Sequence, residues 1–187
     1  MDVIEYTCDE MDINIYQRFL PENDRDRLFK KIIENPRHIK NPLKGKKRNK
    51  TIYGSVKEYN YFYRGKKVTT KIIPWEEFRP LQKLAKRIEK VTGQPYNTCV
   101  IQIYGSGSVG IKPHRDKEMK PGSIIASISL GETRRMKFER NGFDSLDVEL
   151  ESGDLCLINP PTNNYWAHSI PTDTTKDVRV SLVYRNF

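Results

Sequence analysis

Cysteine is scarce in this chain of 187 residues: there are three, Cys8, Cys99 and Cys156, and no CxxC pair. Because the three are far apart and odd in number, they do not form a disulfide framework or a zinc ribbon, and a reducing compartment is expected. The sequence also lacks a long apolar run, a secretory signal segment and any repeat at a fixed period. We therefore expect a soluble, intracellular monomer without a membrane partner, in either the nucleus or the cytoplasm.

Acidic residues are too few to balance the basic ones: 33 Lys and Arg stand against 24 Asp and Glu, a formal net charge of +9. This balance indicates a polyanionic partner, with nucleic acid before an acidic membrane surface. A simpler alternative is that the charge only keeps the protein soluble. The densest positive segment is residues 36–50, which hold seven Lys or Arg, two Pro and one Gly. We expect a basic loop there and no regular element.

Two helices are predicted in the first half of the chain. Apolar residues recur at helical spacing after a capping Asn23 or Asp24, and again over residues 75–92, where Gly93 ends the pattern. Between these helices, "YNYFYRGKK" interleaves aromatic and basic residues. It fits a nucleic-acid surface, because aromatic rings stack on bases and cations meet phosphates, and it also fits a β-hairpin with a half-buried aromatic face.

From residue 97 onward the pattern changes to short β-runs separated by turn residues. The runs are "TCVIQIY", "SIIASISL", "RRMKFER", "LDVEL", "DLCLINP" and "VRVSLVYRNF". Such a string indicates an antiparallel barrel or jelly roll with the helices packed outside, hence an α+β, mainly β, fold. The chain is most simply one domain, residues 1–187, in which 1–95 hold the helices, basic loop and hairpin, and 96–187 the β core.

Histidine is rarer than any charged residue, and one of the three opens the segment "HRDKE". In an extended segment, the side chains of His114 and Asp116 leave the same face and could both bind a divalent metal. Of the other histidines, His38 lies in the basic loop, whereas His168 lies in the β region and is the natural third ligand. Two His and one carboxylate suit a non-haem Fe(II) site. The alternative reading of His-x-Asp is a surface turn.

The last β-run places two arginines on one face of a strand. Arg179 and Arg185 are six apart, and share their face with Ser181 and Val183. Two arginines that point into a barrel are costly unless an anion meets them, and a small dicarboxylate would satisfy both. The alternative is a pair of edge-strand arginines in water.

Together these segments resemble the AlkB family of Fe(II)- and 2-oxoglutarate-dependent nucleic-acid demethylases, in particular the branch that repairs alkylated bases in duplex DNA. The likeness runs from about Tyr53 to Phe187 and rests on the segments "IYG", "YFYRG", "VTGQPYN", "IQIYG", "HRDKE", "PGSIIASISLG", "PTNNYWAHSIP" and "RVSLVYR". The resemblance implies a double-stranded β-helix, or jelly roll, that uses Fe(II), 2-oxoglutarate and O2 to demethylate bases such as 1-methyladenine and 3-methylcytosine in DNA.

The resemblance also implies a role for each matching residue. The metal and catalytic ligands would be His114, Asp116 and His168. The residues around 2-oxoglutarate would be Gln102, Tyr104, Arg179, Ser181 and Arg185. Gln102 and Ser181 each stand where the family has Asn. The residues that contact nucleic acid would be Arg48, Tyr61, Tyr63 and Glu118, with Tyr63 stacked on the flipped base. Glu118 could equally be a solvated loop charge.

One feature of the family's duplex branch is absent, namely an aromatic finger that fills the gap left by the flipped base. The basic loop contains no Phe, Tyr or Trp, so His38, Ile39 and Leu43 are the candidates for an apolar wedge. Either an aliphatic residue fills the gap, or the protein prefers single strands or RNA. The remaining alternatives are a nucleic-acid-binding module without chemistry, and a hydroxylase of proteins or small molecules on the same scaffold.

Overall fold

The computed structural model describes residues 2–43, 45–63 and 66–187, without the side chains of residues 59, 61–63 and 67. The strands are β1 (Val3–Cys8), β2 (Met11–Tyr16), β3 (Asn49–Gly54), β4 (Glu58–Tyr63), β5 (Lys66–Lys71), β6 (Ile73–Pro74), β7 (Thr98–Tyr104), β8 (Ile111–His114), β9 (Ile125–Gly131), β10 (Arg134–Glu139), β11 (Leu146–Leu150), β12 (Leu155–Ile158), β13 (Ala167–Ile170) and β14 (Arg179–Arg185). The helices are α1 (Glu22–Ile33), the 3-10 helix η1 (Trp75–Phe78), α2 (Arg79–Thr92) and the short α3 (Thr162–Tyr165). Within the described ranges, no helix has the length and apolar character needed to span a membrane.

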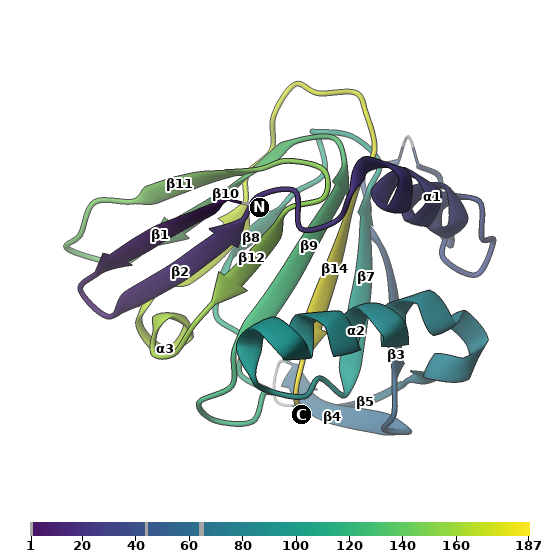
Figure 1. The fold of residues 1–187 in the computed structure, drawn as a ribbon, viewed down its shortest axis with the longest axis horizontal. Helices are drawn as coiled ribbons and strands as arrows, with labels where there is room; N and C mark the ends of the chain where they lie inside the picture. The colour runs from purple at the N-terminus through teal and green to yellow at the C-terminus, as the bar shows by residue number, and fades with distance from the viewer. Residues whose placement is uncertain (1, 44, 64–65) are drawn as a thin grey trace.

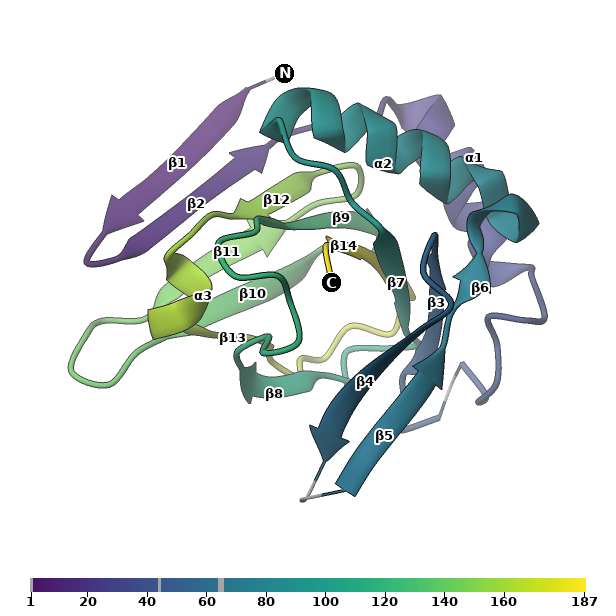
Figure 2. The same cartoon turned by 90° about the horizontal axis from the view of Figure 1, so that it is seen from below.

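The strands form two facing sheets, and the predicted double-stranded β-helix is confirmed. The large sheet has the order β1-β2-β12-β9-β14-β7-β3-β6 and the small sheet the order β11-β10-β13-β8. Figure 2 shows β9, β14 and β7 on one side of the barrel, with β10, β13 and β8 opposite. The two-stranded β4–β5 hairpin projects from the β3–β6 edge, away from α2 (Figure 2). The expected β core began at residue 96. The large sheet also includes β1, β2, β3 and β6, which lie before that residue.

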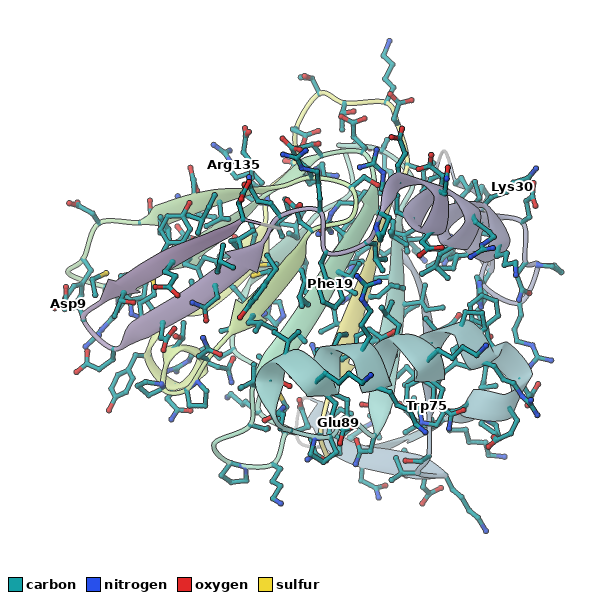
Figure 3. The ribbon with its side chains drawn as sticks, in the orientation of Figure 1. Asp9, Phe19, Lys30, Trp75, Glu89 and Arg135 are labelled. Carbon is teal, nitrogen blue, oxygen red and sulfur yellow. The ribbon has the colours of Figure 1, made fainter. Side chains whose placement is uncertain are left out.

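Helices α1 and α2 cover the outer face of the large sheet (Figure 1). Helix α2 buries Leu81, Leu84, Ala85 and Ile88, as their spacing predicts, and ends at Gly93, whose φ of 70° is left-handed. The same layer includes Phe19 and Trp75, which are labelled in Figure 3 and are 2% and 4% exposed. Burial of this apolar layer fixes the sheet's outer face, so the other face is free to form the interior of the barrel.

Strand β14 has two buried faces with different tasks. Val180, Leu182 and Tyr184 belong to the core beneath the helices, whereas Val183 belongs to the core inside the barrel. Because side chains alternate along a strand, Arg179 lies on the barrel face together with Val183. The predicted division of this strand into two faces is therefore confirmed.

One local expectation needs correction, and one element was missed. The first helix has Pro21 at its N-cap and begins at Glu22, so neither Asn23 nor Asp24 caps it. The N-terminal β1–β2 hairpin was not predicted. Its alternating pattern, with Met11, Ile13 and Ile15 buried, was the signal that could have revealed it.

The basic loop is irregular in its described part until Asn49, where β3 begins. None of its three wedge candidates projects from it. His38 is fully buried, and its Nδ1 and Nε2 lie 2.9 Å from the Ile32 carbonyl oxygen and the Tyr53 hydroxyl. Ile39 and Leu43 pack against the core beneath the helices. The expectation that one of the three fills a gap in a base stack therefore has no support in this conformation.

The buried imidazole of His38 makes stability depend on pH. Burial lowers the pKa of His38 below its ordinary value of 6.5. As the pH falls below about 6.5, the unfolded chain takes up a proton at His38 that the folded chain resists, so the free energy of unfolding decreases. We expect His38→Gln to show a smaller loss of stability between about pH 7 and about pH 5 than the parent chain, measured by urea unfolding. Parallel curves for the two proteins would mean that His38 has the same pKa in both states.

Candidate metal and cosubstrate site

The two imidazoles of the site come from neighbouring strands of the small sheet. His114 ends β8 and is the register partner of His168 in β13. Their ring centroids are 4.4 Å apart. His168 is 8% exposed, while the side chain of His114 is 31% exposed and lies nearer the opening. Strand pairing thus brings together two histidines that are more than fifty residues apart in the sequence.

Asp116 supplies a carboxylate to the same place from the loop after β8. Its Oδ1 lies 3.8 Å from Nε2 of His114, and its Oδ2 lies 2.6 Å from a terminal nitrogen of Arg185. One ligand atom from each of His114, Asp116 and His168 falls within 4.8 Å of the others. Since Arg185 neutralises one carboxylate oxygen, the other is left to face the two imidazoles.

The protonation of the histidines fits a metal site. Nδ1 of His114 lies 3.0 Å from the Lys112 carbonyl oxygen, to which it donates, so Nε2 keeps its lone pair. Burial lowers the pKa of His168 to about 4, so this imidazole is neutral at physiological pH. Its Nδ1 is buried and has no described hydrogen-bond partner. Two imidazoles and one carboxylate are the donor set that suits Fe(II).

A side chain that the sequence did not single out holds Asp116 in place. The Asn163 carboxamide accepts a hydrogen bond from the Asp116 backbone N–H at 2.9 Å and donates to its carbonyl oxygen at 2.7 Å. Asn163 lies in α3, which Thr162 fastens to β2 through hydrogen bonds with the backbone of Asp12. Asp116 is therefore positioned from outside its own loop. The two-residue His-x-Asp spacing gives no sign of this.

The barrel interior continues from the metal ligands as a narrow cavity between the two sheets. Its lining includes four of the residues expected around the cosubstrate, Gln102, Tyr104, Ser181 and Arg185, together with His114 and His168. Gln102 is the register partner of Ser181 across β7 and β14. Ser181 and Ser127 share a hydrogen bond of 3.1 Å between their hydroxyls. The cavity thus joins the metal ligands to the polar middle of the large sheet.

Arg179 lies at the other end of β14 from Arg185 and is fully buried. One terminal nitrogen donates to the Ser129 hydroxyl at 2.8 Å, but Nε and the second terminal nitrogen have no described partner. Its guanidinium lies 5.3 Å from the centre of the Tyr104 ring. A buried cation with free donors is costly until an anion reaches it. The far carboxylate of a dicarboxylate that enters along the cavity fits this requirement.

A further buried arginine, Arg134, was missed in the sequence. Its terminal nitrogens donate to four backbone carbonyl oxygens, at Ser106, Gly107, Val109 and Pro171, and its Nε lies 2.6 Å from Oδ2 of Asp173. It thus holds the loop after β7 against the loop after β13. The glycines of "YGSGSVG" permit this contact, because a Cβ at Gly107 would lie 1.7 Å from the Asp173 side chain.

The residues expected to contact nucleic acid do not form a described cluster as the metal ligands do. Glu118 is exposed and makes no described contact. Arg48 is half-buried, and it donates to Oε1 of Gln102. Tyr61 and Tyr63 lie in β4, but their side chains are outside the described part of the structure. The β4–β5 hairpin that carries them has the predicted form.

Comparison with known proteins agrees with a site that suits Fe(II). The sequence matches the 2OG-Fe(II) oxygenase superfamily over residues 12–185. It is 34% identical over 150 residues to the DNA oxidative demethylase ALKBH2 of Mus musculus, a match that covers 74% of this chain and 61% of that protein. It is 35% identical over 152 residues to the Homo sapiens protein of that name, over 74% of this chain and 56% of that protein. The chain thus spans somewhat over half the length of these relatives.

More distant relatives extend the pattern. The alpha-ketoglutarate-dependent dioxygenase alkB homolog 3 of Homo sapiens is 30% identical over 118 residues, which are 56% of this chain and 41% of that protein. The solved structure of OsALKBH1 superposes with a TM-score of 0.67 at 14% identity, and covers 98% of this chain and 100% of that one. This last likeness shows the fold alone. The AlkB resemblance expected from the sequence motifs is confirmed by the relatives.

The role of Asn163 in positioning Asp116 can be tested by metal binding. We expect Asn163→Leu to weaken Mn(II) binding about 10-fold, because loss of a hydrogen bond behind a ligand misorients it. The measurement is titration of the metal-free protein followed by electron paramagnetic resonance. Asn164→Leu is the matched control, since the neighbouring side chain is exposed and should leave the affinity unchanged. Equal affinities in Asn163→Leu and the parent chain would show that Asp116 holds its position without the amide.

Proposed function

Because the chain belongs to the 2OG-Fe(II) oxygenase superfamily, we propose that it is an Fe(II)- and 2-oxoglutarate-dependent dioxygenase that removes alkyl groups from bases in DNA, as a monomer. The single observation that carries the proposal is the His114–Asp116–His168 cluster at one end of a cavity, beyond whose other end lies a buried Arg179 with two nitrogens that have no partner among the described residues. That arrangement would provide a metal site and hydrogen-bond donors for a dicarboxylate in one barrel.

The chain's own residues would each have a defined task. His114, Asp116 and His168 would hold the metal, while Arg185 fixes the direction of the Asp116 carboxylate. Tyr104, Ser181 and Arg179 would bind and orient the cosubstrate. Bound Fe(II) with 2-oxoglutarate and O2 supplies the oxidising power that hydroxylates an N-methyl group, whose product releases formaldehyde. Apolar side chains in the cavity lining, among them Ile125, Ile158 and Val183, would limit the access of water to this chemistry.

Three features support DNA as the substrate. ALKBH2 is described as a DNA oxidative demethylase, and its match covers 74% of this chain. The net charge of +9 suits a polyanion. Lys46 and Lys47 are exposed in the basic loop and can meet phosphates. A base must leave the stack to reach a barrel interior, at a cost of a few kcal/mol, and stacking against an aromatic side chain such as Tyr63 would offset about 1–3 kcal/mol of it.

Strand preference follows from the missing finger. In the described part of the basic loop, His38, Ile39 and Leu43 all pack inward, so none is placed to fill the gap left by a flipped base. A single strand needs no pair opened and no gap filled. We therefore propose single-stranded DNA as the better substrate.

The catalytic proposal is tested by coupling two products. With a methylated oligonucleotide, the parent chain should release formaldehyde and convert 2-oxoglutarate to succinate in equal amounts. His168→Ala should release less than about 1% of that formaldehyde, because the metal loses one of three ligands. Arg135→Ala changes an exposed arginine on β10 and serves as the control (Figure 3). Formaldehyde release by His168→Ala at the parent rate would refute the assignment of the metal ligands.

Strand preference is tested with one lesion in four contexts: single- and double-stranded DNA, and single- and double-stranded RNA. We expect methylated single-stranded DNA to react at least as fast as the matching duplex. Replacing Lys46 and Lys47 by Gln should reduce the log–log salt dependence of single-strand binding by about 1.4, since each phosphate contact contributes about 0.7. A clear preference for duplex, lost on Ile39→Ala, would show that an aliphatic wedge exists after all. Faster reaction on RNA would move the substrate class from DNA to RNA.

A further inference from the structure

The aromatic ring of Tyr104 is surrounded by cations. The guanidinium carbons of Arg48, Arg134 and Arg179 lie 5.7, 5.8 and 5.3 Å from its centre. Only one carboxylate, that of Asp173, is paired with any of the three in the described part of the chain. The end of the barrel away from the metal ligands therefore carries an excess of positive charge, which favours an anion there.

The three arginines differ in what their donors already bind. Arg134 is committed to four carbonyl oxygens and Asp173, so it has a structural task. Arg179 keeps free donors and suits the ligand directly. Arg48 is the third, and its described hydrogen bond goes to Gln102, which lines the cavity.

The backbone at Arg48 is held in place by a network of hydrogen bonds. The buried Asn49 accepts hydrogen bonds from the backbone N–H groups of Lys40 and Asn41, at 2.8 and 2.6 Å, and donates to the Asn41 carbonyl oxygen at 3.0 Å. The Asn41 side chain in turn donates to the Arg48 carbonyl oxygen at 3.3 Å. The loop is thus folded back on itself next to Arg48, whose guanidinium lies against Gln102 and Tyr104.

The contact with Arg48 fixes the direction of the Gln102 carboxamide. A guanidinium has donors and no acceptor, so the atom of Gln102 that faces it is the oxygen. The amide nitrogen of Gln102 is left as a donor for whatever occupies the cavity. Here the extra methylene of Gln, compared with the family's Asn, has a use, because it carries the oxygen to Arg48.

We infer that Arg48 is a positioning residue for 2-oxoglutarate: it acts through Gln102, and turns that amide to donate to the cosubstrate. The inference rests on the proposed function, and it places Arg48 in cosubstrate recognition, where the family resemblance implies nucleic-acid contact. Arg48 and Gln102 would then act on the cosubstrate as a two-residue unit.

The test measures cosubstrate affinity without nucleic acid or turnover. 2-Oxoglutarate is titrated calorimetrically into the Mn(II)-loaded protein under anaerobic conditions. We expect Arg48→Met to weaken binding about 10-fold, equivalent to about 1.4 kcal/mol, and Arg48→Lys to weaken it less. Lys47→Met, the exposed neighbour in the same loop, is the control and should change affinity less than about twofold. In a Gln102→Leu background, Arg48→Met should have little further effect, because the two residues act as a unit.

Each other outcome has a definite meaning. Unchanged affinity in Arg48→Met, with weaker binding of a single-stranded oligonucleotide, would overturn the inference and leave the proposed function standing. Additive losses in the double variant would also overturn it, since Arg48 would then act without Gln102. Absence of 2-oxoglutarate binding in the parent chain would instead reject the proposed function itself. Thermal denaturation of each variant separates these results from unfolding, and Arg48→Gln replaces Arg48→Met should the latter not fold.

Discussion

The ion pair between Asp116 and Arg185 is the interaction on which the rest of the site depends. It joins a loop at the edge of the small sheet to a strand in the middle of the large one. Their side chains are only 6% and 12% exposed, so water and salt screen the pair little. Loss of either partner would leave a buried charge, a defect that typically costs about 3–5 kcal/mol. The same ion pair leaves the second carboxylate oxygen of Asp116 facing the two imidazoles. One interaction therefore both links the two sheets and orients a metal ligand.

Strand β14 carries two arginines with low solvent exposure, and their surroundings differ. Arg185 has an internal counter-charge, whereas the described contacts of Arg179 are with the hydroxyl of Ser129 and the face of Tyr104. A buried guanidinium so placed makes the ligand-free fold less stable than it could be. An arriving carboxylate would recover that free energy as binding energy, which would account for such a costly residue at a buried position.

Much of this architecture could be predicted from the sequence, because local periodicity encodes it. The two faces of β14 follow from alternation, and α2 follows from helical spacing ended by Gly93. The contacts that complete the site could not be predicted in this way. Asn163 reaches Asp116 across 47 residues, and Arg48 reaches Gln102 across 54. Such pairs depend on which strands become neighbours, and nothing in the composition of either segment records the partner. The β1–β2 hairpin was missed for another reason: β1, with the sequence VIEYTC, has no alternation of apolar and polar residues, so β2 alone carried the signal.

Strand β8 has only four residues, lies at the edge of the small sheet as described, and pairs with β13 across an irregular register. Short edge strands with one neighbour are among the first parts of a fold to open. An ion bound by both His114 and His168 would link β8 to β13, and its binding free energy would be added to the local stability of β8. The catalytic metal would then also hold β8 in the small sheet. Chelation would first release β8 as a local event, well before the helices and the large sheet lose their cooperative structure.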